Sequence, residues 1–285
     1  MLEDKILGVF EGDNGLFKDK EVFDVHHIPE KFLFRDQQMK TLASNIKPAF
    51  NGGGPVHTVI LGDHATGKTT AMKKLFEIIE TIEPRIIPVY INCKTYNTKF
   101  KIYSIIFEKV FKVESLKRGT SAAILFDKIM KGLKQKKQIL IVVLDDVNYL
   151  LEDNKGQELF YELTRAYEMF KVKIGIYPIL TGMEFRYTFD KNIRTIFIPQ
   201  EIIFPYYTFD EIYSILKKRA CVGFQKGVID QEILLRVSEV TKDSNNLRLG
   251  LNILQNLGIM AENEGSNHIT NNQFNQLIKS KQKYL

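Results

Sequence analysis

The stretch LGDHATGKTT, residues 61–70, decides the fold, and its first residue is the last of the apolar run at residues 56–61. Within it the order G-x-x-x-x-G-K-T lies between a predicted strand and a predicted helix, which is the context that this motif requires. Glycines at 62 and 67 let the backbone fold around an anion, so that successive N–H groups and the positive end of the helix dipole face it. A glycine-rich turn that matches by accident is the alternative, and the flanking strand and helix argue against it.

The loop is predicted to hold a nucleoside triphosphate, ATP or ADP, with Mg²⁺. Its expected binding residues are Gly62, Asp63, His64, Ala65, Thr66, Gly67, Lys68, Thr69 and Thr70. Lys68 would neutralise charge on the β- and γ-phosphates, and the hydroxyl of Thr69 would be a ligand of Mg²⁺. A further acidic ligand of the metal is expected at the end of a neighbouring strand.

The apolar run of residues 139–144 supplies that acidic end, because Asp145 and Asp146 follow it directly. We expect Asp145 to be the second metal-binding residue and Asp146 to orient an attacking water. A helix-capping role for one of the two is the alternative. Thr181 ends a further apolar run and is a candidate for contact with the γ-phosphate, with a strand-end cap as its alternative.

Short apolar runs alternate with helical patterns as far as Pro205, which predicts an α/β fold with a parallel sheet. The expected strands cover residues 56–61, 86–91, 139–144, 174–180 and 201–204. Only helical patterns follow Pro205. We therefore expect an α/β nucleotide-binding domain at 1–205, including an N-terminal lead-in, and a small all-helical domain at 206–285.

Composition excludes several classes of protein. The chain has 285 residues, a net charge of +6 and two cysteines, Cys93 and Cys221, without metal-binding spacing. No apolar run approaches the ~18–20 residues needed to cross a bilayer, and the N-terminus lacks the pattern of a secretory signal. We expect an intracellular protein with no membrane partner.

Positive charge is concentrated in residues 94–118, which hold seven Lys/Arg and two Glu, a net of +5. Such a local excess is typical of a surface that binds a nucleic-acid backbone. The alternative is a solvated helix face, because apolar residues such as Ile102 and Ile106 show that one side of this helix belongs to the core.

Further segments extend the pattern beyond the phosphate loop. They are LFRD at 33–36, YINCK at 90–94, LDDV at 144–147, EIIFPY at 201–206, ILKKRA at 215–220 and the stretch around Arg248. In this order and spacing they resemble the archaeal and eukaryotic replication initiators of the origin-recognition and cell-division-cycle (ORC/CDC) family, a branch of the AAA+ ATPases.

The resemblance implies an AAA+ P-loop NTPase core with a small helical lid domain. It implies that adenine lies near Ile28, Pro29 and Arg35, and that Thr181 and Arg248 are the first and second sensor residues. Arg194 would be an arginine finger toward a neighbouring subunit. For Arg194 and for Arg248 a surface charge is the alternative.

The resemblance also implies partners and a DNA-facing tip. The expected partners are duplex DNA, the replicative helicase and other AAA+ initiator subunits, in the cytoplasm and nucleoid of an archaeon or in the nucleus of a eukaryote. The expected DNA-contacting residues are Lys112, Lys117, Arg118, Gly119 and Thr120.

Three departures from the family pattern qualify these expectations. Asp146 stands where the family usually has glutamate, and Thr181 stands where asparagine is common. The sequence ends at Leu285, just after the lid, where family members usually continue into a winged-helix domain. We therefore predict an ATP-dependent DNA-binding initiator with slow ATP hydrolysis. The main alternative is a non-catalytic subunit that binds nucleotide structurally and contacts only proteins; a small-molecule kinase is disfavoured, because the lid and basic segment have no role there.

Overall fold

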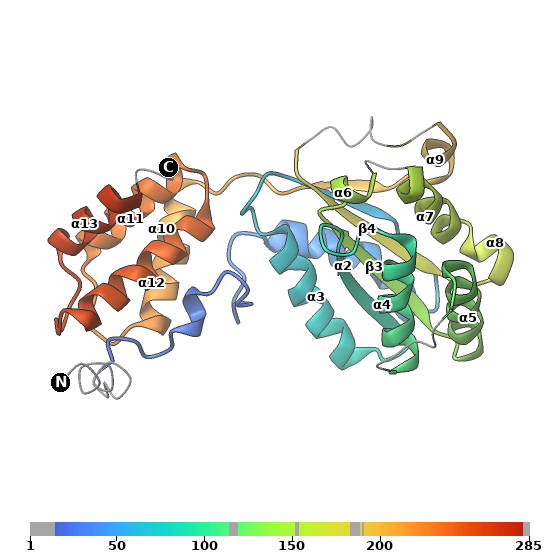
Figure 1. Ribbon diagram of the computed structural model, residues 1–285, viewed down its shortest axis with the longest axis horizontal. Coiled ribbons are helices and arrows are strands. Elements are labelled where there is room, and N and C mark those ends of the chain that lie inside the picture. The colour runs from blue at the N-terminus through green and yellow to red at the C-terminus, as the bar shows by residue number, and fades with distance from the viewer. Residues whose placement is uncertain (1–14, 114–118, 152–153, 183–188, 190, 282–285) are drawn as a thin grey trace. The chain divides into compact units, whose positions relative to one another are not determined.

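The computed structural model describes residues 15–113, 119–151, 154–182, 189 and 191–281 (Figure 1). Its contacts divide the chain into an α/β unit, residues 35–205, and a helical unit that combines residues 15–34 with 206–281. Lys117 and Arg118 of the expected DNA-facing tip lie outside the described residues.

A five-stranded parallel sheet forms the centre of the α/β unit, as the sequence predicts. Its strands are β1 (Thr58–Leu61), β2 (Ile86–Asn92), β3 (Ile139–Asp145), β4 (Ile174–Leu180) and β5 (Gln200–Ile203), in the spatial order β2-β3-β4-β1-β5. Every residue of β3 and β4 is buried, which accounts for their unbroken apolar runs. Because the strands are parallel, the phosphate loop after β1 and the carboxylates after β3 reach the same edge, with the end of β4 between them.

Helices cover the two faces of this sheet (Figure 1). They are α2 (Asp36–Phe50), α3 (Lys68–Ile82), α4 (Lys99–Phe111), α5 (Ala122–Gln135), α6 (Asn148–Leu151), α7 (Asn154–Thr164), α8 (Ala166–Phe170) and α9 (Lys191–Ile196). The hydroxyls of Thr98 and Ser121 accept backbone N–H groups at the starts of α4 and α5, which fixes where both helices begin.

The helical unit contains α10 (Phe209–Gly223), α11 (Gln231–Asp243), α12 (Leu247–Asn263) and α13 (Asn271–Lys281), together with a short 3-10 helix, η1 (Glu21–Phe23). Thr208 and Glu211 form a capping box at the start of α10, which ends the extended segment after Pro205. Among the described helices of the chain, none combines the length and apolar character that a membrane span requires.

Residues 15–34 of the N-terminal lead-in group with the helical unit, which corrects their expected place in the α/β domain. The rings of Phe17 and Phe23 pack on Phe224, with centroids 5.1 and 4.7 Å away. Glycines make room for them: a Cβ at Gly223 would lie 2.3 Å from the Phe23 ring, and one at Gly258 would lie 2.4 Å from the Phe17 ring. Sequence position suggested the wrong partner, because a short aromatic segment does not reveal which distant helix has a gap for it.

His57 makes the stability of the α/β unit depend on pH. Its Nδ1 accepts the Ile176 N–H at 3.2 Å, and burial lowers the pKa of the imidazole from 6.5 to about 4. An unfolded chain therefore binds a proton below about pH 6.5 that the folded chain refuses until about pH 4, so folding loses stability as the pH falls through this window. We expect a loss of about 2 kcal/mol between pH 6.5 and pH 5.

Urea unfolding of wild type and His57→Asn at pH 7 and pH 5 measures this contribution. Asparagine can still accept the Ile176 N–H but does not titrate, so the variant should lose about 2 kcal/mol less than wild type over that interval. Carboxylates titrate equally in both proteins. Equal losses in the two proteins would show that His57 is not the cause.

Candidate nucleotide site and basic surface

The phosphate loop, residues 62–67, joins β1 to α3 through backbone conformations that favour glycine. Gly62 has φ +147° and Gly67, at the N-cap of α3, has φ +95°. A Cβ at Gly62 would lie only 2.4 Å from the carbonyl oxygen of Phe204, so a side chain there would displace the backbone. Inside the loop, the Thr66 hydroxyl donates to the Asp63 carbonyl at 2.9 Å. The resulting sharp turn ends at the first turn of a helix, the arrangement that binds phosphate.

Lys68 places its ammonium group against this loop. The residue is only 7% exposed, and its Nζ donates to the carbonyls of Gly62 and Asp63 at 2.7 and 2.5 Å. These bonds hold a positive charge beside the N-terminal end of α3, where the helix dipole adds to its field. Contact of Lys68 with the phosphates of a nucleotide stays a prediction.

Asp145 and Thr69, 76 positions apart in sequence, meet at this edge of the sheet. One carboxylate oxygen of Asp145 accepts the Thr69 hydroxyl at 2.6 Å and the Tyr90 hydroxyl at 2.6 Å. Burial, followed by the neighbouring Asp145 charge, raises the pKa of Tyr90, so the phenol stays a donor. An adjacent hydroxyl and carboxylate supply oxygen ligands of the kind that Mg²⁺ prefers, so the residues fit the predicted metal.

Asp146 is oriented by Asn92. Its backbone has φ +53°, and its side chain accepts the Asn92 amide N–H at 3.1 Å. The side-chain oxygen Oδ1 of Asn92 in turn accepts the backbone N–H groups of Lys94 and Thr95, at 3.0 and 3.3 Å. Asn92 therefore connects the second carboxylate to the turn that leads into α4.

Tyr90 and Asn92 are site residues that the motif reasoning missed. They stand at alternate positions near the end of β2, whose register pairs Asn92 with Asp145. Polar side chains at such positions of an otherwise apolar strand are the signal that could have identified them, because β2 ends at the same edge as the phosphate loop.

The remaining predicted site residues are distributed over both units. Thr181 directly follows β4 at the edge of the sheet that carries the loop, and Arg194 is exposed in the last turn of α9. Ile28, Pro29 and the exposed Arg248 belong to the helical unit. The contacts of these residues with nucleotide, or of Arg194 with a neighbouring subunit, stay predictions.

Arg35 is buried at the start of α2, with only 2% of its surface exposed. Its Nε donates to the Thr66 carbonyl at 3.1 Å, and its Nη2 donates to the Pro205 carbonyl at 2.7 Å. These bonds attach the side chain to the backbone of the phosphate loop. Contact of Arg35 with the adenine base stays a prediction.

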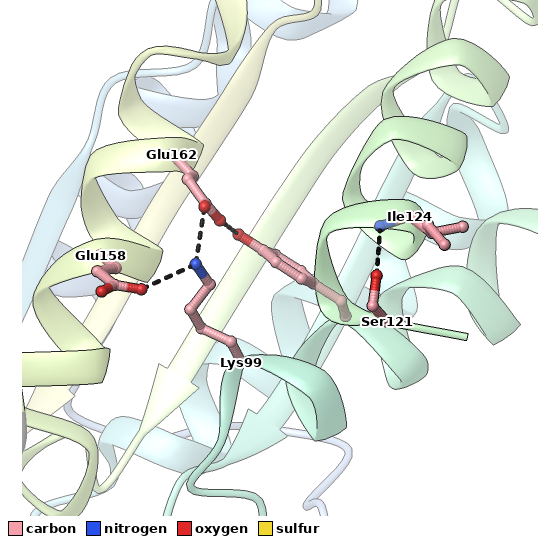
Figure 2. A network of polar contacts seen from close by, with 6 residues as sticks. Lys99, Ser121, Ile124, Glu158 and Glu162 are labelled. Carbon is pink, nitrogen blue, oxygen red and sulfur yellow. Dashed lines mark hydrogen bonds and ion pairs between the residues drawn. The ribbon is translucent and has the colours of Figure 1, made fainter. Parts of the chain in front are cut away.

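The basic segment is less cationic in the folded chain than its sequence suggests. Figure 2 shows Lys99 between two carboxylates of α7, Glu158 at 3.1 Å and Glu162 at 2.7 Å. Glu162 also accepts the Tyr103 hydroxyl, and Lys109 pairs with Glu80 of α3 at 2.6 Å. Counting charges within residues 94–118 missed these partners because they lie elsewhere in the sequence.

Exposed lysines remain near both ends of α4. Lys101 and Lys112 are exposed, and Lys112 ends α4 in a left-handed conformation, φ +55°. Gly119 forms an exposed turn with φ +81°, and the half-buried Thr120 follows it. Of the predicted DNA-contacting residues, the structure therefore places Lys112, Gly119 and Thr120 on either side of the undescribed residues 114–118.

Comparisons with known proteins identify both units. An AAA domain model matches residues 53–188, and a model of the Cdc6 AAA+ ATPase-type lid domain matches residues 213–276. The chain is 40% identical over 269 residues to ORC1-type DNA replication protein 2 of Methanothermobacter thermautotrophicus, covering 94% of this chain and 71% of that protein. It is 34% identical over 271 residues to ORC1-type DNA replication protein 3 of Haloarcula marismortui, with coverage of 94% and 71%.

Solved structures show the same fold. The Aeropyrum pernix ORC1 protein in complex with DNA has a TM-score of 0.81 and 23% identity, covering 93% of this chain and 69% of that one. Cdc6p from Pyrobaculum aerophilum has a TM-score of 0.78 and 24% identity, with coverage of 90% and 69%. The fold is thus an AAA+ core with a Cdc6-type helical lid.

Proposed function

Because the chain belongs to the family of ORC1-type DNA replication proteins, we propose that it is an ATP-dependent, DNA-binding replication initiator that acts in origin recognition and helicase loading. The observation that carries the proposed nucleotide binding is the pair of hydrogen bonds that Asp145 accepts from Thr69 and Tyr90 beside the phosphate loop. Motif spacing and long-range geometry agree there. The names of the curated relatives support the role in replication.

The residues at the sheet edge divide the nucleotide chemistry among them. Lys68 and the N-terminus of α3 offset phosphate charge, and Thr69 with Asp145 would hold Mg²⁺, which supplies further charge neutralisation. Asp146, oriented by Asn92, would direct a water toward the γ-phosphate. Because Asp146 is one methylene shorter than glutamate, hydrolysis would be slow. Bound nucleotide would then act mainly as a switch that shifts the chain from one conformation to another.

Duplex DNA is the proposed partner of the exposed end of α4 and the turn at Gly119. The Aeropyrum pernix relative was solved in complex with DNA, which supports this assignment. Replicative helicase and other AAA+ initiator subunits are the proposed protein partners. All of the curated relatives cited above are archaeal, so we propose the cytoplasm and nucleoid of an archaeon as the location.

Fluorescence anisotropy with labelled duplex DNA, in ATP or ADP and at several salt concentrations, tests the proposal. The variant Lys112→Ala/Lys117→Ala/Arg118→Ala should bind at least about tenfold more weakly. Its log–log salt dependence should also be shallower by about 2–3, because each phosphate contact contributes about 0.9 to that slope. The matched control Lys40→Ala/Lys47→Ala/Lys226→Ala removes the same charge from exposed positions outside α4 and α5 and should bind like wild type.

Two results would contradict the proposal. Equal weakening by both triple variants would mean that only net charge matters and that the α4 end is not the contact. Absence of binding by wild type at low salt, with either nucleotide, would favour the non-catalytic interaction subunit. The neutralisation of Lys99 and Lys109 within the fold is the observation that keeps this second function in view.

A further inference from the structure

The chain crosses between its two units at two places, and Arg35 links these two crossing points. One passage lies between residues 34 and 35, and the other lies between residues 205 and 206. Arg35 is the first residue of the α/β unit and Pro205 is the last, and the Arg35 Nη2 donates to the Pro205 carbonyl at 2.7 Å. A single side chain therefore ties the start of the α/β unit to its end.

The same guanidinium group orients a peptide of the phosphate loop. Arg35 Nε donates to the carbonyl oxygen of Thr66, a residue that is itself 1% exposed. In a trans peptide the carbonyl and the following N–H point in opposite directions. By holding the Thr66 carbonyl, Arg35 directs the N–H of Gly67 to the other side of the loop backbone, and the charge on arginine polarises that peptide.

Backbone contacts reinforce this link. The Phe204 N–H donates to the Leu61 carbonyl at 2.8 Å, directly before the loop begins. The Phe204 carbonyl oxygen lies 2.4 Å from where a Cβ of Gly62 would be, and the Phe204 ring lies 5.9 Å from the Arg35 guanidinium. Because the loop and residues 204–205 are packed this closely, neither can shift without the other.

We propose that Arg35 is a positioning residue that couples occupancy of the phosphate loop to the conformation of the two passages between the units. The inference rests on the proposed nucleotide switch and names the side chain that transmits it. Arginine suits the role because its planar, rigid fork donates in two fixed directions at once, which a lysine ammonium does not reproduce. Because the side chain is buried, salt screens both bonds less than it would at the surface.

Hydrogen–deuterium exchange of the full chain, with and without saturating ATP or ADP, tests the coupling. In wild type we expect nucleotide to slow exchange at residues 62–69 and also at residues 203–207. Arg35→Lys should bind nucleotide about tenfold or more weakly, since it loses a charge-assisted hydrogen bond. At saturating nucleotide it should keep the protection at 62–69 and lose the protection at 203–207.

Gln38→Ala is the matched control. Gln38 lies one turn further along α2 and also donates to a nearby backbone carbonyl, that of Ile203 at 3.3 Å, but it does not contact the loop through any hydrogen bond that the described residues define. Its variant should bind nucleotide and protect residues 203–207 as wild type does. Arg35→Gln is a second variant and should resemble Arg35→Lys if it folds.

The outcomes separate this inference from the proposed function. Protection of 203–207 in Arg35→Lys equal to that of wild type, or wild-type protection confined to 62–69, overturns the role of Arg35 while nucleotide-sensitive DNA binding can still stand. Loss of coupling in Arg35→Lys, together with nucleotide-insensitive DNA binding by wild type, supports Arg35 and overturns the switch. A wild-type chain that binds neither ATP nor ADP overturns both.

Discussion

Replacing Lys68 by alanine will weaken binding of ATP and ADP by about 100-fold or more. The ammonium group is buried and lies 2.7 and 2.5 Å from two carbonyls of the loop, so it is already in place beside the anion site. Charge-assisted hydrogen bonds contribute about 1.5–3 kcal/mol each, and a lysine can make more than one to a pair of phosphates. Alanine leaves the dipole of α3 and the loop N–H groups without this charge.

Isothermal titration calorimetry with ADP and with ATP measures the loss. Lys74→Ala is the control, because Lys74 lies on the same helix, six residues further on, and forms an ion pair with the exposed Glu77 at 3.4 Å. It should bind nucleotide within about twofold of wild type, as expected for a surface pair. Circular dichroism without nucleotide establishes that Lys68→Ala is folded. An affinity for Lys68→Ala equal to that of the control would show that the loop does not bind phosphate through this residue.

The features that could be predicted from the sequence are those whose signal is local. The phosphate loop follows from glycines, lysine and threonine at fixed spacing, and Asp145 follows from its place at the end of an apolar strand. Parallel strands then require these two segments to share an edge. Their contact, Thr69 to Asp145 at 2.6 Å, agrees with that reasoning.

Features that depend on long-range pairing could not be predicted in the same way. The bond from Asn92 to Asp146 requires the register of β2 against β3, and the ion pairs of Lys99 require the position of α7. The packing of Phe17 against Gly258 requires knowledge of where a helix has no side chain. In each case one partner is informative only after the other has been placed.

Replacing Asp146 by glutamate will increase the rate of ATP hydrolysis, by about tenfold to 100-fold. A displacement of ~1 Å of a catalytic group can change a rate by about 100-fold, and glutamate extends the carboxylate by one methylene toward the attacking water. Asn92 donates to Asp146 at 3.1 Å and is itself held by the backbone N–H groups of Lys94 and Thr95, so the longer glutamate side chain must bend to keep this bond. The cost is backbone strain, since residue 146 has φ +53°, which asparagine and aspartate adopt more readily than glutamate.

Single-turnover release of phosphate at saturating ATP and Mg²⁺ measures the effect, and Asp146→Asn is the matched control. Asparagine keeps the size of the native side chain and tolerates the left-handed backbone, but it cannot act as a base, so its rate should fall below that of wild type. The order glutamate, aspartate, asparagine from fastest to slowest would show that the carboxylate directs the water and that its short reach limits the native rate. Equal rates in all three proteins would mean that residue 146 takes no part in hydrolysis, and the chain would then use nucleotide as a bound structural ligand.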